Sequence, residues 1–138
     1  MLLAAVLFLP LPAGAISAQK AILLDGTTNR VLLKKDASSR SLIASTTKIM
    51  TALVVCERCN VLDRVRIPKE AVGIEGSSIY LEEGEVVTVE ELLYGTMLQS
   101  GNDAATALAC CLGPNLESFV AKMNKRAKEL GCMQTNFM

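Results

Sequence analysis

The feature that most constrains the fold is a short apolar run, Ile49–Val55, which directly follows the polar segment Ser45–Lys48. Apolar residues recur in this run with helical spacing, and few polar residues interrupt it. Because a helix that is apolar on most of its faces is buried, the rest of the chain must surround a helix from Ser45 to about Cys56. Ser45 and Lys48 would then lie one turn apart on one face, at the start of that helix.

The remaining periodicity predicts a hairpin followed by a largely helical block. Two apolar runs of strand length flank the turn residues Asp25–Asn29, and Thr88 and Glu91 have the spacing of a capping box. Gly/Ser-rich loops separate further short segments. The expected strands are 21–24 and 30–34, with an extended piece at 65–67 and a small hairpin within 79–87; the other expected helices are 88–98, 103–112 and 116–130.

The length of 138 residues suits one modest domain. Two strands do not form a stable sheet by themselves, so the N-terminal hairpin is expected to be the edge of a larger sheet. The order of elements, strands and then helices, favours an α/β protein of the α+β type.

Composition excludes several classes of function. Fourteen basic residues balance fourteen acidic ones, so the net charge gives no reason to expect a nucleic-acid partner. The chain has no His, which excludes a His-based triad and His metal ligands within it. No metal or other cofactor is expected.

The five cysteines are interpreted as small packing residues. Cys56 and Cys59 form a lone CxxC at the end of a predicted helix, with neither a second pair nor a His to complete a zinc site. Free cysteine behaves as a small hydrophobe. The odd count leaves at least one thiol unpaired, and the sequence does not assign disulfides.

The N-terminal segment is predicted to be a secretory signal peptide, residues 1–18. Met1–Leu11 is almost entirely apolar, too short for the roughly 20 residues that span a bilayer, and interrupted by Pro10. Ala13–Ala15 has the small-x-small pattern that signal peptidase cleaves. A basic n-region is missing, and a buried N-terminal helix is the alternative. The mature chain, from residue 19, is therefore expected to be exported.

Ser45 and Lys48 form a candidate nucleophile–base pair. A hydroxyl is a weak nucleophile until a neighbouring base takes its proton, and a lysine can be that base when part of it is free amine. At a helix N-terminus, unpaired N–H groups and the positive end of the dipole would favour a developing oxyanion. The spacing alone also fits a simple N-cap at Ser45.

A second candidate element is Ser100–Asn102, a polar tripeptide between two predicted helices. It would place a hydroxyl and an amide side chain at a helix–helix corner. Capping of the following helix by Ser100 or Asn102 is the alternative interpretation. Each motif is ambiguous alone, but SxxK followed by Ser-x-Asn is part of a motif set known from penicillin-binding proteins and class A β-lactamases.

The two motifs and their surroundings closely resemble the serine D-alanyl-D-alanine carboxypeptidases, the low-molecular-mass penicillin-binding proteins. The resemblance extends over residues 21–138 and is carried by Ala44–Leu53, Leu98–Ala105, Gly76–Leu81 and Glu129–Gly131. It implies a β-lactamase/penicillin-binding-protein-like transpeptidase fold, an antiparallel sheet with a helical subdomain. It also implies that the sheet lacks its later strands here. The expected domain is therefore 19–138, the N-terminal part of a catalytic domain.

The resemblance implies acyl transfer on peptidoglycan stem peptides that end in D-Ala-D-Ala, on the outer side of the bacterial cytoplasmic membrane. Ser45 would be the nucleophile, Lys48 the general base, Ser100 a proton relay and Asn102 a substrate-positioning residue. β-Lactam antibiotics would acylate Ser45. No cofactor is implied, and association with the membrane is left open.

The third motif of the family, Lys-Thr-Gly on a sheet strand, does not occur in the 138 residues. In the family that strand recognises the substrate carboxylate and supplies an oxyanion-hole N–H, so the chain alone is expected to be inactive. A Lys-Thr-Gly is expected further along the coding sequence.

Two alternatives stay open. A class A β-lactamase would show Ser-Asp-Asn rather than Ser-Gly-Asn, and the candidate acids Glu117 and Glu129 fall on an amphipathic helix pattern. The second alternative, a non-catalytic cell-wall-binding fragment, follows from the missing third motif.

Overall fold

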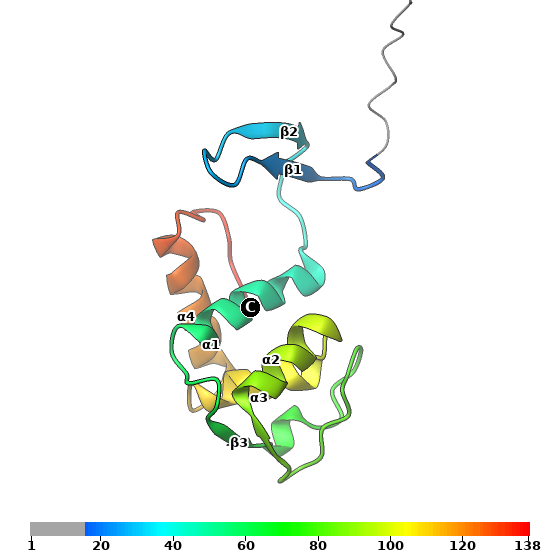
Figure 1. The fold of residues 1–138 in the computed structure, drawn as a ribbon, viewed down its shortest axis with the longest axis vertical. Helices are drawn as coiled ribbons and strands as arrows, with labels where there is room; N and C mark the ends of the chain where they lie inside the picture. Colours follow the sequence, from blue (N-terminus) through cyan, green and yellow to red (C-terminus); the bar gives the residue numbers. More distant parts are fainter. Residues whose placement is uncertain (1–15) are drawn as a thin grey trace, which may run out of the picture. The chain divides into compact units, whose positions relative to one another are not determined.

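The computed structural model describes residues 16–138, which form two compact units, one up to Leu42 and one from Ile43 to Met138 (Figure 1). The predicted signal peptide, residues 1–18, lies outside the described residues except for its last three positions.

The first unit is built on the predicted β-hairpin, which is confirmed. Strand β1, Ala21–Leu24, pairs antiparallel with β2, Val31–Lys35, and a bulge follows Leu23. The turn is fixed by Asp25, whose Oδ1 accepts hydrogen bonds from the amides of Thr27 and Thr28 at 3.2 and 2.7 Å. Short polar side chains that bond their own turn are typical of such connections.

The apolar side chains of the hairpin are half exposed among the described residues. Their exposed fractions lie between 45% and 56% for Ile22, Leu23, Leu24, Val31 and Leu32. Exposed apolar residues on both faces of an isolated pair of strands are expected when a sheet is incomplete. The prediction that this hairpin belongs to a larger sheet is consistent with that exposure.

The second unit packs its helices around α1, Thr47–Cys56, which contacts α2, α3 and α4 (Figure 1). The other helices of this unit are α2, Val89–Leu98; α3, Asn102–Cys111; and α4, Leu116–Glu129. Two short 3-10 turns, η1 at Ala44–Thr46 and η2 at Lys69–Ala71, complete it. The predicted helices are thus confirmed to within two residues at their ends.

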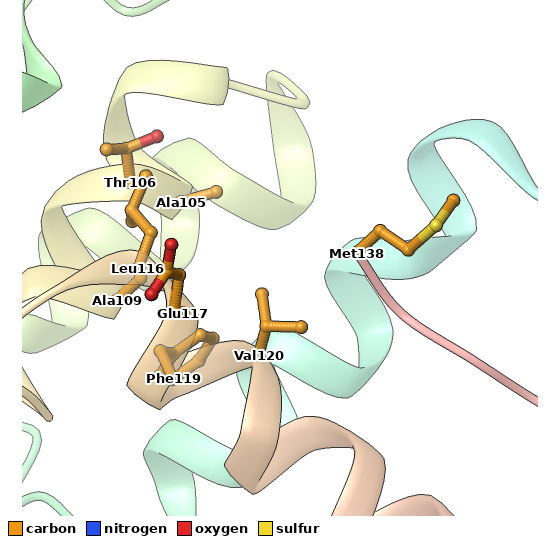
Figure 2. Close-up of a pocket in the computed structure, with 8 residues that line it drawn as sticks. All are labelled: Ala105, Thr106, Ala109, Leu116, Glu117, Phe119, Val120 and Met138. Carbon is orange, nitrogen blue, oxygen red and sulfur yellow. The ribbon is translucent and has the colours of Figure 1, made fainter.

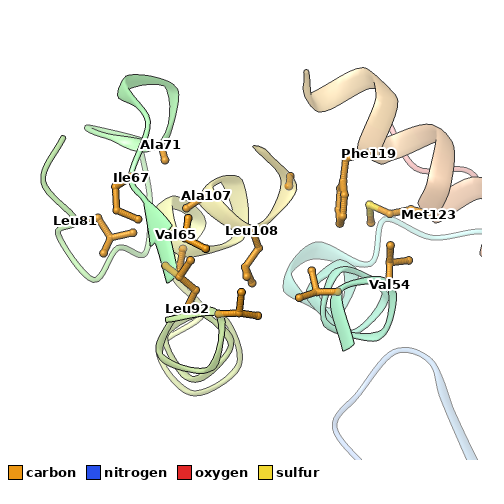
Figure 3. Packing of buried hydrophobic residues seen from close by; sticks show 14 of the residues in the cluster. Val54, Val65, Ile67, Ala71, Leu81, Leu92, Ala107, Leu108, Phe119 and Met123 are labelled. Carbon is orange, nitrogen blue, oxygen red and sulfur yellow. The ribbon is translucent and has the colours of Figure 1, made fainter. Parts of the chain in front are cut away.

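The core of the second unit lies between these helices (Figure 3). Phe119 and Met123 of α4 point towards Val54 of α1. Leu108 of α3 lies near Leu92 of α2. The largest fully buried apolar side chains are Ile67, Leu92, Leu108, Val54, Val55 and Val89. At 1.5–3 kcal/mol for each fully buried large apolar side chain, roughly, this cluster is the main stabilising feature of the unit.

The prediction that α1 is buried on most faces is only partly right. Thr51, Val54 and Val55 are buried, but Ile49 is 59% exposed. The helices α2, α3 and α4 bury the faces of α1 that they contact. Ile49 lies on the remaining face of α1.

The predicted hairpin within 79–87 is wrong. A two-stranded antiparallel sheet does form, but it pairs β3, Arg64–Arg66, with β4, Val86–Thr88. Segment 75–81 is irregular, because the amides of Ile79 and Leu81 donate to the Asp103 carboxylate instead of to a strand. A buried carboxylate competes successfully for the donors that a ladder would use.

The helix ends follow the predicted chemistry where caps exist. At α2, Thr88 Oγ1 accepts from the Glu91 amide at 3.2 Å and Glu91 Oε2 accepts from the Thr88 amide at 2.7 Å, which is the predicted capping box. At α4, Asn115 Oδ1 accepts from the Ser118 amide at 2.9 Å. These bonds satisfy amides that have no partner within the helix.

All five cysteines are free thiols in this structure. Burial raises the pKa of the Cys59 and Cys110 thiols, and it raises the pKa of Cys111 to about 11. Since the thiolate is the reactive form, these shifts disfavour reactive thiols. Cys56, Cys111 and Cys132 are nevertheless exposed, and Cys59 and Cys110 are only half-buried, so the interpretation of all five as buried packing residues is wrong for at least three of them. Within residues 16–138 no cluster of three or more Cys, Asp or Glu side chains is arranged to hold a metal ion.

Among the described residues no single helix is both long and apolar enough to span a bilayer. The pair α3 and α4, bent by 88° at its junction, meets the criteria of length and composition only when taken together.

Candidate active site

Ser45 lies in the 3-10 turn η1, immediately before the first residues of α1, and its side chain is exposed. Lys48 is the second residue of α1. The backbone is helical at Thr46 and Thr47, so the turn continues into α1 without a break. Because side chains three residues apart align in a 3-10 turn, Ser45 and Lys48 share one side of this helical start.

The amides that follow Ser45 are not free, contrary to the expectation of unpaired N–H groups there. The Thr46 amide donates to the Ile43 carbonyl at 3.1 Å, and the Thr47 amide bonds back to the carbonyl of Ala44. The 3-10 turn uses these donors because its hydrogen bonds close over three residues instead of four.

Lys48 and Asn102 are in direct contact. Lys48 Nζ donates to Asn102 Oδ1 at 2.6 Å, across 54 residues of sequence. The Asn102 side chain is held from its other end as well, because Nδ2 donates to the Glu75 carbonyl at 2.8 Å. The two sequence motifs, predicted separately, therefore meet through their lysine and their asparagine.

Ser100 lies in the corner between α2 and α3 with a φ of 55°, in the left-handed region. Its Oγ is buried and has no hydrogen-bond partner among the described residues. Buried hydroxyls are nearly always hydrogen-bonded, so an unpaired one two residues before Asn102 is a functional candidate, and Thr96 Oγ1 of α2 is unpaired as well. Neither Ser100 nor Asn102 forms the predicted cap, since the N-cap of α3 is Gly101 and makes no side-chain bond.

The space at Gly101 explains why the motif is Ser-Gly-Asn. A Cβ atom at this position would lie 2.9 Å from Asp103 Oδ1 and 3.2 Å from the Gly95 carbonyl oxygen. Contacts that short require a neighbour to move, and both neighbours belong to packed helices. An aspartate in the middle of the motif, the class A β-lactamase pattern, would not fit beside Asp103 as it lies here.

Backbone strain marks the same region. Within residues 16–138, five residues other than glycine have positive φ, and two of them, Asn29 and Asp36, are residue types that tolerate it in turns. The other three are Ala44, Tyr80 and Ser100, with φ of 44°, 62° and 55°. Ala44 precedes Ser45, and Tyr80 lies in the segment that contacts Asn102 and Asp103. Strained backbone of this kind persists where the surrounding structure enforces it, often at functional sites.

Asp103 and the carbonyl groups of Glu75 and Ser77 belong to this site and were not predicted from the sequence. The Asn102 amide donates to the Ser77 carbonyl at 2.7 Å, and the Ser78 hydroxyl donates to the Asp103 carboxylate at 2.6 Å. A charged residue in an otherwise alanine-rich helix was the available signal for Asp103.

An apolar pocket lies away from these residues. It has a volume of about 450 Å³ and is bounded by α3, α4 and Met138 (Figure 2). None of Ser45, Lys48, Ser100 or Asn102 lines it. Its walls are almost wholly apolar, so it offers little to hold a polar substrate.

Comparison with known proteins identifies the family. The model of the D-alanyl-D-alanine carboxypeptidase family, peptidase S11, matches residues 9–138. The chain belongs to this family of serine peptidases. Its curated relatives include DacF of Bacillus subtilis, 43% identical over 128 residues, and DacC of Escherichia coli, 37% identical over 136 residues. These matches cover 89% and 91% of this chain but 33% and 34% of the relatives, so the chain spans about a third of their length.

Solved structures confirm the expected fold. The D-alanyl-D-alanine carboxypeptidase DacD of Francisella tularensis matches with a TM-score of 0.84 at 32% identity, over 88% of this chain and 31% of that protein. The Streptomyces K15 DD-transpeptidase matches with a TM-score of 0.82 at 40% identity, over 88% and 52%. The chain therefore has part of the penicillin-binding-protein fold, and the names of its relatives favour the carboxypeptidase assignment over the β-lactamase alternative.

Proposed function

We propose that this chain carries the nucleophile and its base for a serine D-alanyl-D-alanine carboxypeptidase. The observation that supports this most is the 2.6 Å hydrogen bond between Lys48 Nζ and Asn102 Oδ1. It joins the SxxK and Ser-x-Asn motifs at a lysine that lies one turn from an exposed Ser45, and acyl transfer by a serine needs such a base within reach of the hydroxyl.

In the first step, Lys48 as free amine takes the proton of the Ser45 hydroxyl. Ser45 Oγ then bonds to the carbonyl carbon of the penultimate D-Ala of a peptidoglycan stem peptide. The C–N bond to the terminal D-Ala breaks, and the leaving amine accepts a proton through Ser100, whose buried Oγ has no other described partner. Since Asn102 Oδ1 holds one N–H of Lys48, the lone pair of the free amine can be directed to Ser45.

In the second step, water attacks the ester on Ser45, and Lys48 takes a proton from that water. The C–O bond to Ser45 breaks, Lys48 returns the proton to Ser45 Oγ, and the shortened peptide is released with the Ser45 hydroxyl and the Lys48 amine restored. Asn102 would also bind the substrate amide. β-Lactams would acylate the same oxygen, and the site of action would be the bacterial cell envelope, where peptidoglycan lies.

Labelling with a fluorescent penicillin tests the proposal. The 138-residue chain and a chimaera that continues it with the remaining part of Bacillus subtilis DacF would be labelled side by side. Because the Lys-Thr-Gly motif is absent from the 138 residues, we expect little labelling of the chain and strong labelling of the chimaera. Ser45→Ala should abolish the adduct, Ser41→Ala is the matched control, and mass spectrometry of the Ser45 peptide locates it.

The alternatives predict other results. A β-lactamase would release the penicilloyl group within seconds, so rapid loss of the label would contradict a carboxypeptidase. A non-catalytic cell-wall-binding fragment would give a chimaera without any Ser45-dependent adduct.

A further inference from the structure

The Asp103 side chain is the most heavily hydrogen-bonded group near the candidate active site, and nothing in the proposed reaction uses it. Only 1% of Asp103 is exposed. Its carboxylate accepts from the Ser78 hydroxyl at 2.6 Å and from the amides of Ile79, Leu81 and Ala104 at 3.1, 3.1 and 2.8 Å. A buried carboxylate with this many donors is bonded as an anion, and it lies in the first turn of α3, where the helix dipole favours negative charge.

The hydrogen bonds outweigh burial in setting the charge of this group. Burial raises the pKa of the Asp103 carboxyl, but the Ser78 hydroxyl and the amides of Leu81, Ile79 and Ala104 together hold the pKa below its ordinary value. Asp103 is therefore ionised at neutral pH, and the bonds that it accepts are charge-assisted.

Three of these donors belong to segment 75–81, which has no helix or strand of its own. The carboxylate accepts the hydrogen bonds that a neighbouring β-strand would otherwise accept, and it fixes residues 78, 79 and 81 against the start of α3. The neighbouring carbonyl groups of the same segment then reach Asn102. The Glu75 carbonyl accepts from the side-chain Nδ2 of Asn102 at 2.8 Å, and the Ser77 carbonyl accepts from the backbone N–H of Asn102 at 2.7 Å.

These contacts leave only one orientation for the side-chain amide group of Asn102. A carbonyl oxygen can only accept, so Nδ2 must face Glu75, and Oδ1 is then the atom that faces Lys48 and accepts from Nζ. Segment 75–81 thereby decides which atom of Asn102 is presented to the lysine.

Gly76 shows how closely the segment approaches Asn102. A Cβ atom at Gly76 would lie 2.7 Å from Asn102 Nδ2, and the residue has a φ of 96°. Gly73 also has a positive φ, 70°, but a Cβ atom there would meet nothing within 4 Å. An alanine would be strained at either glycine, but only Gly76 touches the site.

We propose that Asp103 is a positioning residue: its carboxylate fixes segment 75–81 over the start of α3, and that segment orients the Asn102 amide so that Oδ1 meets Lys48. This inference deepens the proposed function and rests on it for its catalytic meaning. The positioning itself can be measured without any activity.

The test observes Asn102 directly, in the 138-residue chain labelled with 15N-asparagine. Asn102→Ala assigns the side-chain amide signal. In the unaltered chain we expect this NH2 group to exchange with solvent about fivefold more slowly than those of the exposed Asn29 and Asn136, as one hydrogen bond would cause. Gly76→Ala should remove that protection and shift the signal, whereas Gly73→Ala should leave both unchanged.

Asp103→Asn should give the same Asn102 spectrum as Gly76→Ala, because an NH2 group in place of Oδ2 cannot accept from Ser78 and Leu81. Ser78→Ala, which removes a single donor, gives a milder form of that change if Asp103→Asn does not fold. The proposal is overturned if Gly76→Ala and Gly73→Ala have the same effect on Asn102. It is also overturned if folded Asp103 or Ser78 variants lower only the melting temperature. Absence of penicillin labelling in the chimaera would count against the proposed function and not against this positioning.

Discussion

The β1–β2 hairpin and the helical unit of this chain contain similar apolar residues but bury them to very different extents. The hairpin residues Ile22 and Leu32 are 56% and 51% exposed, whereas Leu92 and Leu108 of the helical unit are 1% and 0% exposed. The strands of the hairpin and the helices of the second unit both form where the sequence predicts them. They differ in burial. Other described elements cover the apolar faces of the helices, whereas the apolar side chains of the hairpin stay half exposed.

The difference shows that secondary structure and stability are separate properties here. An isolated two-stranded hairpin is marginal in water, while a set of helices that encloses its own core can be stable. We therefore expect the helical unit, residues 43–138, to provide nearly all of the cooperative stability. The candidate active site lies wholly within that unit.

The largest expected effect is in hydrogen exchange of the intact chain. Amides of α1 and α3 should exchange at least about a thousandfold more slowly than those of β1 and β2, because the helices open with the core and the hairpin opens alone. Residue-resolved exchange by NMR measures this directly. Equal protection of the amides in both regions would contradict the conclusion that the helical unit provides nearly all of the stability.

Core truncation should separate the two regions by several kcal/mol. Leu108→Ala removes a fully buried side chain and should lower the free energy of unfolding by about 2–5 kcal/mol. Leu32→Ala removes a half-exposed side chain and should change it by less than about 0.5 kcal/mol. Urea denaturation followed by circular dichroism distinguishes them, and a comparable cost for both would mean that the hairpin is part of the cooperative unit.

Asp103 should make the helical unit sensitive to acid. Because the pKa of its carboxyl is lowered in the folded state, its stabilisation is present above the unfolded value of about 3.9 and is lost as the pH falls through the folded value. Asp103→Asn should cost about 1–3 kcal/mol at pH 7, and the difference should narrow below about pH 3.9.

Asp25, which caps the hairpin turn, is the matched control for this effect. Its carboxylate is also hydrogen-bonded, but it lies in the exposed turn of the first unit. Asp25→Asn should leave the acid unfolding of the helical unit unchanged. A pH dependence that is identical for Asp103→Asn and the unaltered chain would contradict the assignment.

The smallest expected effect is at the α2 cap. Thr88→Ala removes the hydroxyl that accepts from the Glu91 amide and should lower the free energy of unfolding by about 1 kcal/mol. Thr28→Ala removes a hydroxyl from the hairpin turn and should leave the main unfolding transition in place. Thermal unfolding measures both, and a similar shift for the two variants would weaken the distinction between the units.

The sequence predicted the helices well because their signals are local. Apolar spacing, the Thr88–Glu91 pair and the Gly-Pro after α3 act within a few residues, so the helix bounds were right to within two positions. The hairpin within 79–87 was wrong for a non-local reason. The amides of Ile79 and Leu81 bond to Asp103, and neither residue type nor spacing indicates a partner more than twenty positions away.

The sequence by itself determined the helices of the second unit and the motif residues Ser45, Lys48, Ser100 and Asn102, because residue type and spacing carry that information. Only the tertiary structure brought Lys48 onto Asn102 and placed Asp103 beneath segment 75–81. It also showed that Gly101 and Gly76 are held to glycine by their neighbours. These are contacts between distant parts of the chain, and packing around the core decides them.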